Sequence, residues 1–96
     1  MAYWVYILKC SNGALYTGYT SNLQKRYQAH LDGKGAKYTR SFKPIAIEQA
    51  WRVRGSKSRA MQVESYIKKL PKEQKLQWKL NHFYANHNHT NGKKPL

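Results

Sequence analysis

The sequence predicts an α+β fold of the mixed α/β kind, a small three-stranded sheet flanked by helices in the order β-β-α-β-α-α. Two runs rich in aromatic and β-branched residues flank an Asn-Gly turn signal, which predicts an N-terminal hairpin. A third such run stands near the middle of the chain, and apolar residues at helical spacing lie before and after it. With 96 residues the chain suits one domain. We expect that domain to span residues 1–84, and residues 85–96 to form a disordered tail.

The hairpin is the first predicted element. Residues 3–10 (YWVYILKC) and 14–20 (ALYTGYT) have the composition of strands. Ser11, Asn12 and Gly13 form the turn between them, because Asn-Gly readily supplies the positive φ that a tight hairpin needs. A helix then runs from a cap at Thr20 or Ser21 through about residue 31. Its apolar positions repeat at helical spacing, at Leu23, Tyr27 and Leu31.

The segment 33–44 is predicted to be a basic loop. It mixes aromatic rings with positive charge, through Lys34, Lys37, Tyr38, Arg40, Phe42 and Lys43. This mixture suits a track for phosphates with bases stacked on the rings, and Lys68 joins the same nucleic-acid-binding set. A loop whose charges are only solvated is the alternative. A weaker candidate is a metal site on the three histidines near the expected tail, His82, His87 and His89.

The second half of the domain begins with a third strand over residues 45–53 (IAIEQAWRV). Ser56 or Ser58 caps the helix that follows. The apolar stripe of that helix consists of Ala60, Val63, Ile67 and Leu70. Pro71 opens a last short helix, since proline is tolerated at the first helical position. Its docking residues are expected to be Leu76, Leu80 and Phe83.

Positive charge is the strongest global signal. The chain has 18 Lys and Arg against 4 Asp and Glu, a formal net charge of +14. A compact chain this basic repels itself, and a polyanion relieves the repulsion. Nucleic acid is therefore the expected partner, DNA ahead of RNA. An anionic membrane is the lesser option, because the basic residues do not gather on a helix with a bulky apolar face. A basic surface without a polyanionic partner is the remaining alternative.

Other features predict a cytoplasmic protein. No apolar run is long enough to span a membrane, and the first residues lack the pattern of a secretion signal. Cys10 is the only cysteine, which excludes an intramolecular disulfide and fits a reducing compartment. The oligomeric state leaves no mark in the sequence, and we assume a monomer.

Glu64 is the acidic residue with the most informative position. It borders the apolar stripe of its helix and stands among basic residues. One interpretation is an ion pair with Lys68, four residues later. The other is a ligand for a hard cation such as Mg²⁺, which commonly binds one or two carboxylates together with water and phosphate. Both interpretations stay open at this point.

A set of polar residues completes the requirements of phosphodiester hydrolysis. Arg26 and His30 share one helix face, where Arg can clamp a phosphoryl group and His can donate to phosphate or move a proton. Tyr6 and Tyr16 stand on the two hairpin strands. Each residue alone is more typical of a solvated or structural position. Together with Glu64 they offer a base for water, donors for the phosphate and a ligand for a cation.

The arrangement of these residues resembles the GIY-YIG nuclease superfamily. The stretches Trp4-Val5-Tyr6 and Tyr16-Thr17-Gly18, with ten residues from Tyr6 to Tyr16, look like its paired motif. Asn22-Leu23 with Arg26 resembles the next motif, and Glu64 falls where the superfamily keeps a metal-binding glutamate. The chain is similar to small stand-alone bacterial proteins of this superfamily over residues 3–76.

The resemblance implies a metal-dependent endonuclease that hydrolyses phosphodiester bonds in DNA and uses one divalent cation, Mg²⁺ or Mn²⁺. Structured or branched DNA, or RNA, is the alternative substrate. It implies that Tyr6 and Tyr16 line the site, with Tyr16 as the activator of water. It also implies that Arg26 steadies the scissile phosphate, that His30 assists proton transfer and that Glu64 holds the cation. The alternatives are a non-catalytic nucleic-acid-binding module on the same scaffold and, more remotely, an RNA-associated accessory protein.

The chain departs from the pattern at three positions. Trp4 replaces the first glycine, Thr17 replaces an isoleucine, and Tyr19 follows Gly18 where some relatives have lysine. The last change leaves open which group activates water.

The shared site predicts the hairpin register. A two-residue loop would place Tyr6 and Tyr16 on opposite sheet faces. A three-residue loop with Gly13 in the left-handed region would pair Cys10 with Ala14. Tyr6 would then oppose Gly18, with Tyr16 as its diagonal neighbour on the same face. A common site for the two tyrosines requires the second arrangement, and we predict it.

Overall fold

A three-stranded antiparallel sheet forms the centre of the computed structural model, which describes residues 2–78. β1 (Ala2–Cys10) is the central strand, with β2 (Leu15–Thr20) and β3 (Pro44–Arg54) as its two neighbours. The register between β1 and β3 shifts at two bulges, and β3 is one residue longer at each end than predicted. The predicted fold class is confirmed.

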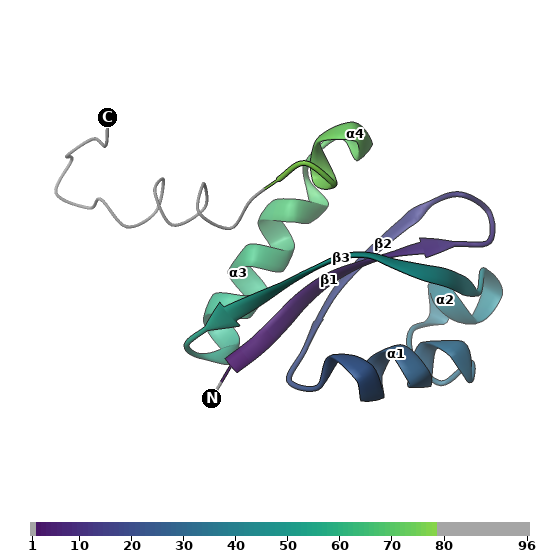
Figure 1. Ribbon diagram of the computed structural model, residues 1–96, viewed down its shortest axis with the longest axis horizontal. Helices are drawn as coiled ribbons and strands as arrows, with labels where there is room; N and C mark the ends of the chain where they lie inside the picture. The colour runs from purple at the N-terminus through teal and green to yellow at the C-terminus, as the bar shows by residue number, and fades with distance from the viewer. Residues whose placement is uncertain (1, 79–96) are drawn as a thin grey trace, which may run out of the picture.

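Helices cover both faces of the sheet. Figure 1 shows α3 (Lys57–Lys68) and α4 (Lys72–Lys75) on one side, and α1 (Leu23–Leu31) and α2 (Lys37–Ser41) on the other. The described helices follow the predicted order with one addition, α2, which lies in the segment predicted to be a loop. Within residues 2–78, none has the length and apolar character that crossing a bilayer requires.

The hairpin has the predicted register. The Cys10 N–H donates to the Ala14 carbonyl at 2.9 Å, and Gly13 takes a φ of 85°. Tyr6 consequently pairs with Gly18, and Tyr16 pairs with the residue two positions after Tyr6. Because side chains alternate between the faces of a strand, the two tyrosines lie on the same face of the sheet.

The main hydrophobic core lies between the sheet and α3. Its fully buried members include Val5, Ile7, Val53, Ala60, Val63 and Ile67. Burial of each of the larger aliphatic side chains stabilises the fold by about 1.5–3 kcal/mol. The predicted stripe of α3 is thus confirmed, with Leu70 packed at its margin. Ser56 is the cap of this helix, since its side chain accepts the Arg59 N–H.

Helix α1 differs from the prediction in its cap and its buried face. Asn22 caps it by accepting the Lys25 N–H at 3.1 Å, while Thr20 instead accepts the N–H of Asn22. The apolar residues of the predicted stripe are only partly buried, and the fully buried residue of α1 is His30. The most deeply buried position of α1 is therefore a polar one, outside the predicted apolar stripe.

Helix α4 packs back on the hairpin through lysine side chains. The Lys72 ammonium donates to the Gly13 carbonyl at 2.7 Å, which ties α4 to the turn between β1 and β2. Pro71 is the cap of this helix, and Leu76 packs against the core as predicted. The predicted tail, the three histidines near it, Leu80 and Phe83 lie outside the described residues.

Candidate active site

The ring of Tyr6 reaches across the edge strand β2, and Gly18 makes the space for it. A Cβ atom at Gly18 would lie 2.5 Å from the Tyr6 hydroxyl and 2.7 Å from its Cζ. The requirement for glycine is therefore steric and does not arise from an unusual backbone conformation. The Tyr6 side chain therefore begins on the central strand and ends beside the edge strand β2.

His30 is fully buried, in contrast to a solvated position on a helix edge. Its Nε2 lies 2.9 Å from the Tyr6 hydroxyl, and its Nδ1 lies 2.7 Å from Oγ1 of Thr39. Gly35 packs flat against the ring, since a Cβ there would overlap Nδ1. Both ring nitrogens thus have protein partners. His30 therefore has no ring nitrogen free to donate directly to a phosphate in this arrangement.

Burial sets the protonation of this pair. Desolvation raises the pKa of Tyr6 to about 12, opposed in part by a hydrogen bond from Arg26. Desolvation, reinforced by the positive charge of Arg26, lowers the pKa of His30 to about 4. Near neutral pH the phenol keeps its proton and the imidazole is uncharged, so the two groups share a neutral hydrogen bond.

Tyr16 connects the buried pair to the surface. Its ring meets His30 edge-on at a centroid distance of 5.4 Å. Its other side stacks on Tyr38 of α2 at 6.3 Å, with an interplanar angle of 10°. Tyr16 is half-buried, so water reaches it more easily than it reaches Tyr6.

Tyr19, whose position after Gly18 raised a question about water activation, lies on the other face. It pairs with Val5 in the sheet and packs against the core under α3. The face that carries Tyr6 and Tyr16 therefore does not include Tyr19.

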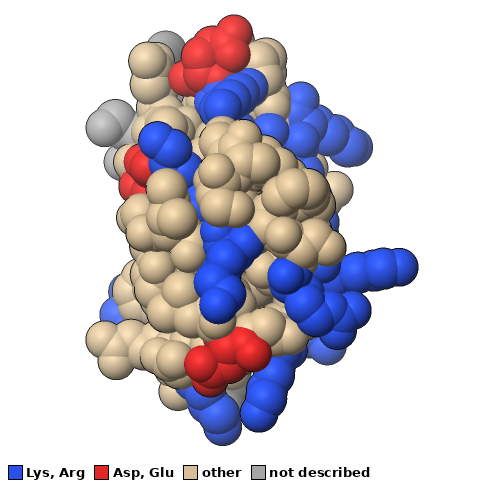
Figure 2. Space-filling view, turned by 90° about the vertical axis from the view of Figure 1, so that its right-hand side faces the viewer, with Lys and Arg blue, Asp and Glu red and all other residues tan. Residues whose placement is uncertain are grey.

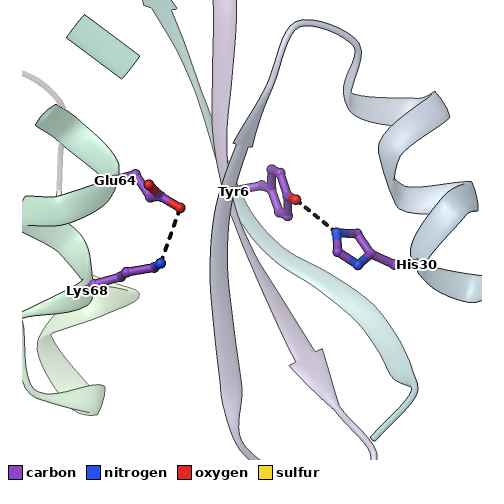
Figure 3. Close-up of polar contacts among 4 residues, drawn as sticks. All are labelled: Tyr6, His30, Glu64 and Lys68. Atoms are coloured by element: carbon purple, nitrogen blue, oxygen red, sulfur yellow. Dashed lines mark hydrogen bonds and ion pairs between the residues drawn. The ribbon is translucent and has the colours of Figure 1, made fainter. Parts of the chain in front are cut away.

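Glu64 and Lys68 approach from the opposite side of the sheet. Figure 3 shows both on α3, whereas Tyr6 points to His30 on the far side of the strands. The Lys68 ammonium lies 3.4 Å from the Glu64 carboxylate, so the predicted ion pair is present in the protein without metal. The carboxylate still acts on the site at longer range, because its charge raises the pKa of Tyr6.

A pocket of about 320 Å³ joins the two sides around the β2 edge. It is lined by Leu15, Tyr16, Thr17, Tyr38, Lys68 and Lys75. Tyr16 and Thr17 are consecutive strand residues that face opposite ways, so the pocket wraps the rim of the sheet. Lys75, which the sequence did not single out, is held there by the carbonyls of Leu70 and Lys68.

The residues of the predicted phosphate track are exposed. Lys34 and Lys43 flank α2, while Lys37, Tyr38 and Arg40 belong to it. Asn12 at the hairpin turn donates to the Tyr38 hydroxyl at 2.8 Å, which holds that ring beside Tyr16. Figure 2 views the end of the molecule that carries α1, α2 and the hairpin turn, and shows Lys and Arg side chains spread widely over it with few acidic groups.

The family of the chain follows from its match to known proteins. Residues 2–81 match the GIY-YIG catalytic domain. The chain belongs to the GIY-YIG family. This is a nuclease family that acts on nucleic acids and generally depends on a divalent metal ion.

Relatives of this GIY-YIG protein include small bacterial proteins of similar length. It is 46% identical to a UPF0213 protein of Bacillus licheniformis over 77% of this chain and 75% of the relative. It is 50% identical to a UPF0213 protein of Clostridium perfringens over 77% and 78%. The solution NMR structure of an E. faecalis protein is 34% identical, covers 93% of both chains and gives a TM-score of 0.56. None of these names states an activity.

The donor atoms present fit the kind of metal ion that GIY-YIG nucleases use. Among residues 2–78, no three His, Cys, Asp or Glu side chains come together as a metal cluster. The available donor is the carboxylate of Glu64, whose side chain is 17% exposed and whose partner Lys68 lines the pocket. A single carboxylate completed by water and substrate phosphate suits Mg²⁺ or Mn²⁺ and would not make a structural zinc site.

Proposed function

We propose that this GIY-YIG protein is a metal-dependent endonuclease that hydrolyses phosphodiester bonds in DNA, with structured or branched DNA, or RNA, among its substrates. Glu64 would hold one Mg²⁺ or Mn²⁺ ion. The observation that carries the proposal is the convergence on the Tyr6 hydroxyl. Nε2 of His30 lies 2.9 Å from it, the ring of Tyr16 packs against His30, and Arg26 and Glu64 are near enough to influence its pKa. These groups come from three different elements besides β1.

The phosphate of the substrate is placed at the β2 edge. Lys68 and Lys75 line the pocket there and supply positive charge for it. Lys68 pairs with Glu64 in the protein without metal, and would be available to the phosphate if Glu64 held a divalent cation, which would supply positive charge there. The exposed charges of Lys37 and Arg40 on α2 continue this surface and hold the flanking backbone.

Tyr16, Tyr6 and Arg26 have separate roles in the hydrolysis step. Tyr16 is accessible to water and accepts a hydrogen bond from the attacking molecule, which directs it at phosphorus. Tyr6 remains a protonated phenol and orients the guanidinium of Arg26. Arg26 donates to the phosphoryl oxygens as negative charge grows on them. A bound divalent cation would offset charge on the phosphoryl and leaving oxygens.

The fold fits a cytoplasmic enzyme that works as a monomer. Cys10 is a free, buried thiol, as expected in a reducing compartment. All proposed groups come from one chain, so the site needs no residue from a second copy.

The test is a cleavage panel with supercoiled, nicked, flapped, branched and single-stranded DNA and a structured RNA. Each substrate is incubated with Mg²⁺ or Mn²⁺, and again with EDTA. Glu64→Gln keeps the side-chain size and removes the charge, so cleavage should be lost while binding is equal or tighter. Glu48→Gln is the matched control, because Glu48 is exposed on β3.

Two results would contradict parts of the proposal. Cleavage by Glu64→Gln at the wild-type rate would exclude the metal role of Glu64. Salt-dependent binding without cleavage of any substrate would instead support the non-catalytic binding module.

A further inference from the structure

A buried chain of polar groups runs from α2 to the Tyr6 hydroxyl. His30 and Thr39 are both 0% exposed, and Tyr6 is 2% exposed. Thr39 Oγ1 lies 2.7 Å from His30 Nδ1, and His30 Nε2 lies 2.9 Å from the Tyr6 hydroxyl. A buried polar group without a hydrogen bond is costly, so each of these three groups needs a partner. This requirement restricts which group donates and which accepts in each contact.

The surroundings of Thr39 determine which group donates. Its Oγ1 accepts the N–H of Ala36 at 3.2 Å and donates to the carbonyl of Ala36 at 3.1 Å. A hydroxyl has one proton and two acceptor lone pairs. With its proton on the Ala36 carbonyl and one lone pair on the Ala36 N–H, Oγ1 has a single lone pair left for His30. In this arrangement Nδ1 carries a proton and donates it to Oγ1.

The tautomer of His30 determines whether the Tyr6 hydroxyl donates or accepts in their hydrogen bond. A neutral imidazole with its proton on Nδ1 has a bare Nε2, which can only accept. The Tyr6 hydroxyl therefore donates its one proton to His30 and keeps both lone pairs free for donors. In the reverse tautomer the Thr39 proton would go to Nδ1 and the Ala36 carbonyl would accept only the N–H of Arg40, at 3.0 Å. Tyr6 is 2% exposed, and the proton of its hydroxyl would then have no acceptor among the described residues.

We propose that Thr39 is a positioning residue that fixes the tautomer of His30 and thereby makes the Tyr6 oxygen a hydrogen-bond acceptor toward Arg26. The proposal rests on the proposed function only where cleavage is used as its measure. Thr39 itself touches no substrate, because it is fully buried on the side of α2 that meets His30. Its hydroxyl links the short helix that bears Lys37 and Arg40 to the phenol at the rim of the sheet.

The direct test is the tautomer of His30 in the full-length protein. Long-range ¹H–¹⁵N correlation spectra near neutral pH distinguish a protonated Nδ1 from a protonated Nε2, and the His30→Gln spectrum identifies the signals that belong to His30. Wild type and Thr39→Ser should both show the Nδ1–H form, since serine keeps the hydroxyl. Thr39→Val keeps the shape and removes the hydroxyl, and its His30 should lose the preference for that form.

Cleavage provides the second measure. Thr39→Val should lower kcat by about 10–100-fold, the usual effect of removing the partner of a functional side chain. KM should stay the same, and Thr39→Ser should restore most of kcat. A wild-type His30 protonated on Nε2 would overturn the proposal. So would a Thr39→Val protein with unchanged tautomer and unchanged kcat.

The two measures separate this inference from the proposed function. If no variant cleaves any substrate but the spectra show the expected tautomers, the enzyme assignment fails and the role of Thr39 in fixing the tautomer stands. If Thr39→Val does not fold, the wild-type and Thr39→Ser spectra still decide the tautomer, and an Nε2–H form in either one would reject the proposal.

Discussion

The Tyr6 hydroxyl and Nε2 of His30 lie 2.9 Å apart, although Tyr6 belongs to the central strand and His30 to α1. The contact passes over the edge strand at the one position, Gly18, that has no side chain to block it. The two residues are 24 positions apart in the sequence, and their contact fixes the position of the Tyr6 hydroxyl. The following predictions test the groups that depend on it.

Replacing Tyr16 should remove activity, whereas replacing Tyr19 should not. Tyr16→Phe deletes the hydroxyl that we propose directs the attacking water, and a loss of about 10²–10⁴-fold is typical of an acid–base group. Tyr19→Phe changes a ring that packs on the opposite face. Single-turnover cleavage under saturating protein measures both. An inactive Tyr19→Phe with an active Tyr16→Phe would reverse the assignment.

Adding one methyl group at Gly18 should displace Tyr6. The new Cβ would overlap the phenol, so we expect Gly18→Ala to lower the free energy of unfolding by about 1–3 kcal/mol, as overpacking does. Cleavage should fall as well, because the hydroxyl loses its position. Urea unfolding and cleavage rates measure the two effects.

The control for this change is Gly13→Asn. Gly13 has positive φ, but a Cβ added there would meet no other atom within 4 Å, and asparagine tolerates that conformation. Near-wild-type stability and cleavage in Gly18→Ala would show that the tyrosine does not need this space.

Acid should weaken the fold through His30. Its pKa is about 4 in the folded protein against an ordinary 6.5. Between these two values the unfolded chain binds a proton that the folded protein does not, so stability falls as pH falls. The loss is up to about 3 kcal/mol, is complete below pH 4 and is absent above pH 6.5.

The comparison that isolates this contribution is His30→Gln, which keeps a neutral polar side chain at all pH values. Urea unfolding from pH 7 to pH 4 should give a shallower loss of stability in the variant. Parallel curves for the two proteins would mean that His30 titrates normally in the folded state.

DNA affinity should depend steeply on salt. Each phosphate neutralised by a lysine or arginine releases counterions, so log affinity falls linearly with log salt. Changing Lys34, Lys37 and Arg40 to glutamine should reduce the slope by up to about 3 and leave the fold intact, because these side chains are exposed.

A matched triple variant controls for net charge. Arg52, Arg54 and Lys57 are also exposed, but they lie where β3 ends and α3 begins, away from α2 and the hairpin turn (Figure 1). Changing them to glutamine should have a smaller effect on the slope. Equal effects of the two triple variants would point to diffuse attraction without a defined track.

The sequence predicted those features that follow from local chemistry. The Asn-Gly pair located the hairpin turn but allowed two loop lengths, and the requirement that Tyr6 and Tyr16 share a face selected the three-residue loop that is observed. The stripe of α3 appears in the core because a helix buries whichever face is apolar.

The features that the sequence did not predict depend on tertiary contacts. α2 has only five residues, too few to show a periodicity, and its buried residue is the polar Thr39. His30 looked like a solvated residue because its burial requires Gly35 and Thr39, which follow it in the chain, to fold over its ring. Lys75 lines the pocket because its ammonium donates to two backbone carbonyls, and the spacing of residues in the sequence does not predict these contacts.

The position of β1 between two partner strands determines how the site responds to local opening. A strand paired on both sides should exchange its amide hydrogens slowly, whereas a five-residue helix at the surface opens readily. Tyr6 therefore lies on the strand whose amides should be best protected from exchange. The charged residues of α2 lie on a helix whose amides should be among the least protected. When α2 frays, Thr39 leaves His30, yet the phenol keeps its backbone support. Local opening of α2, the element proposed to bind a polyanion, would therefore leave the strand that carries Tyr6 intact.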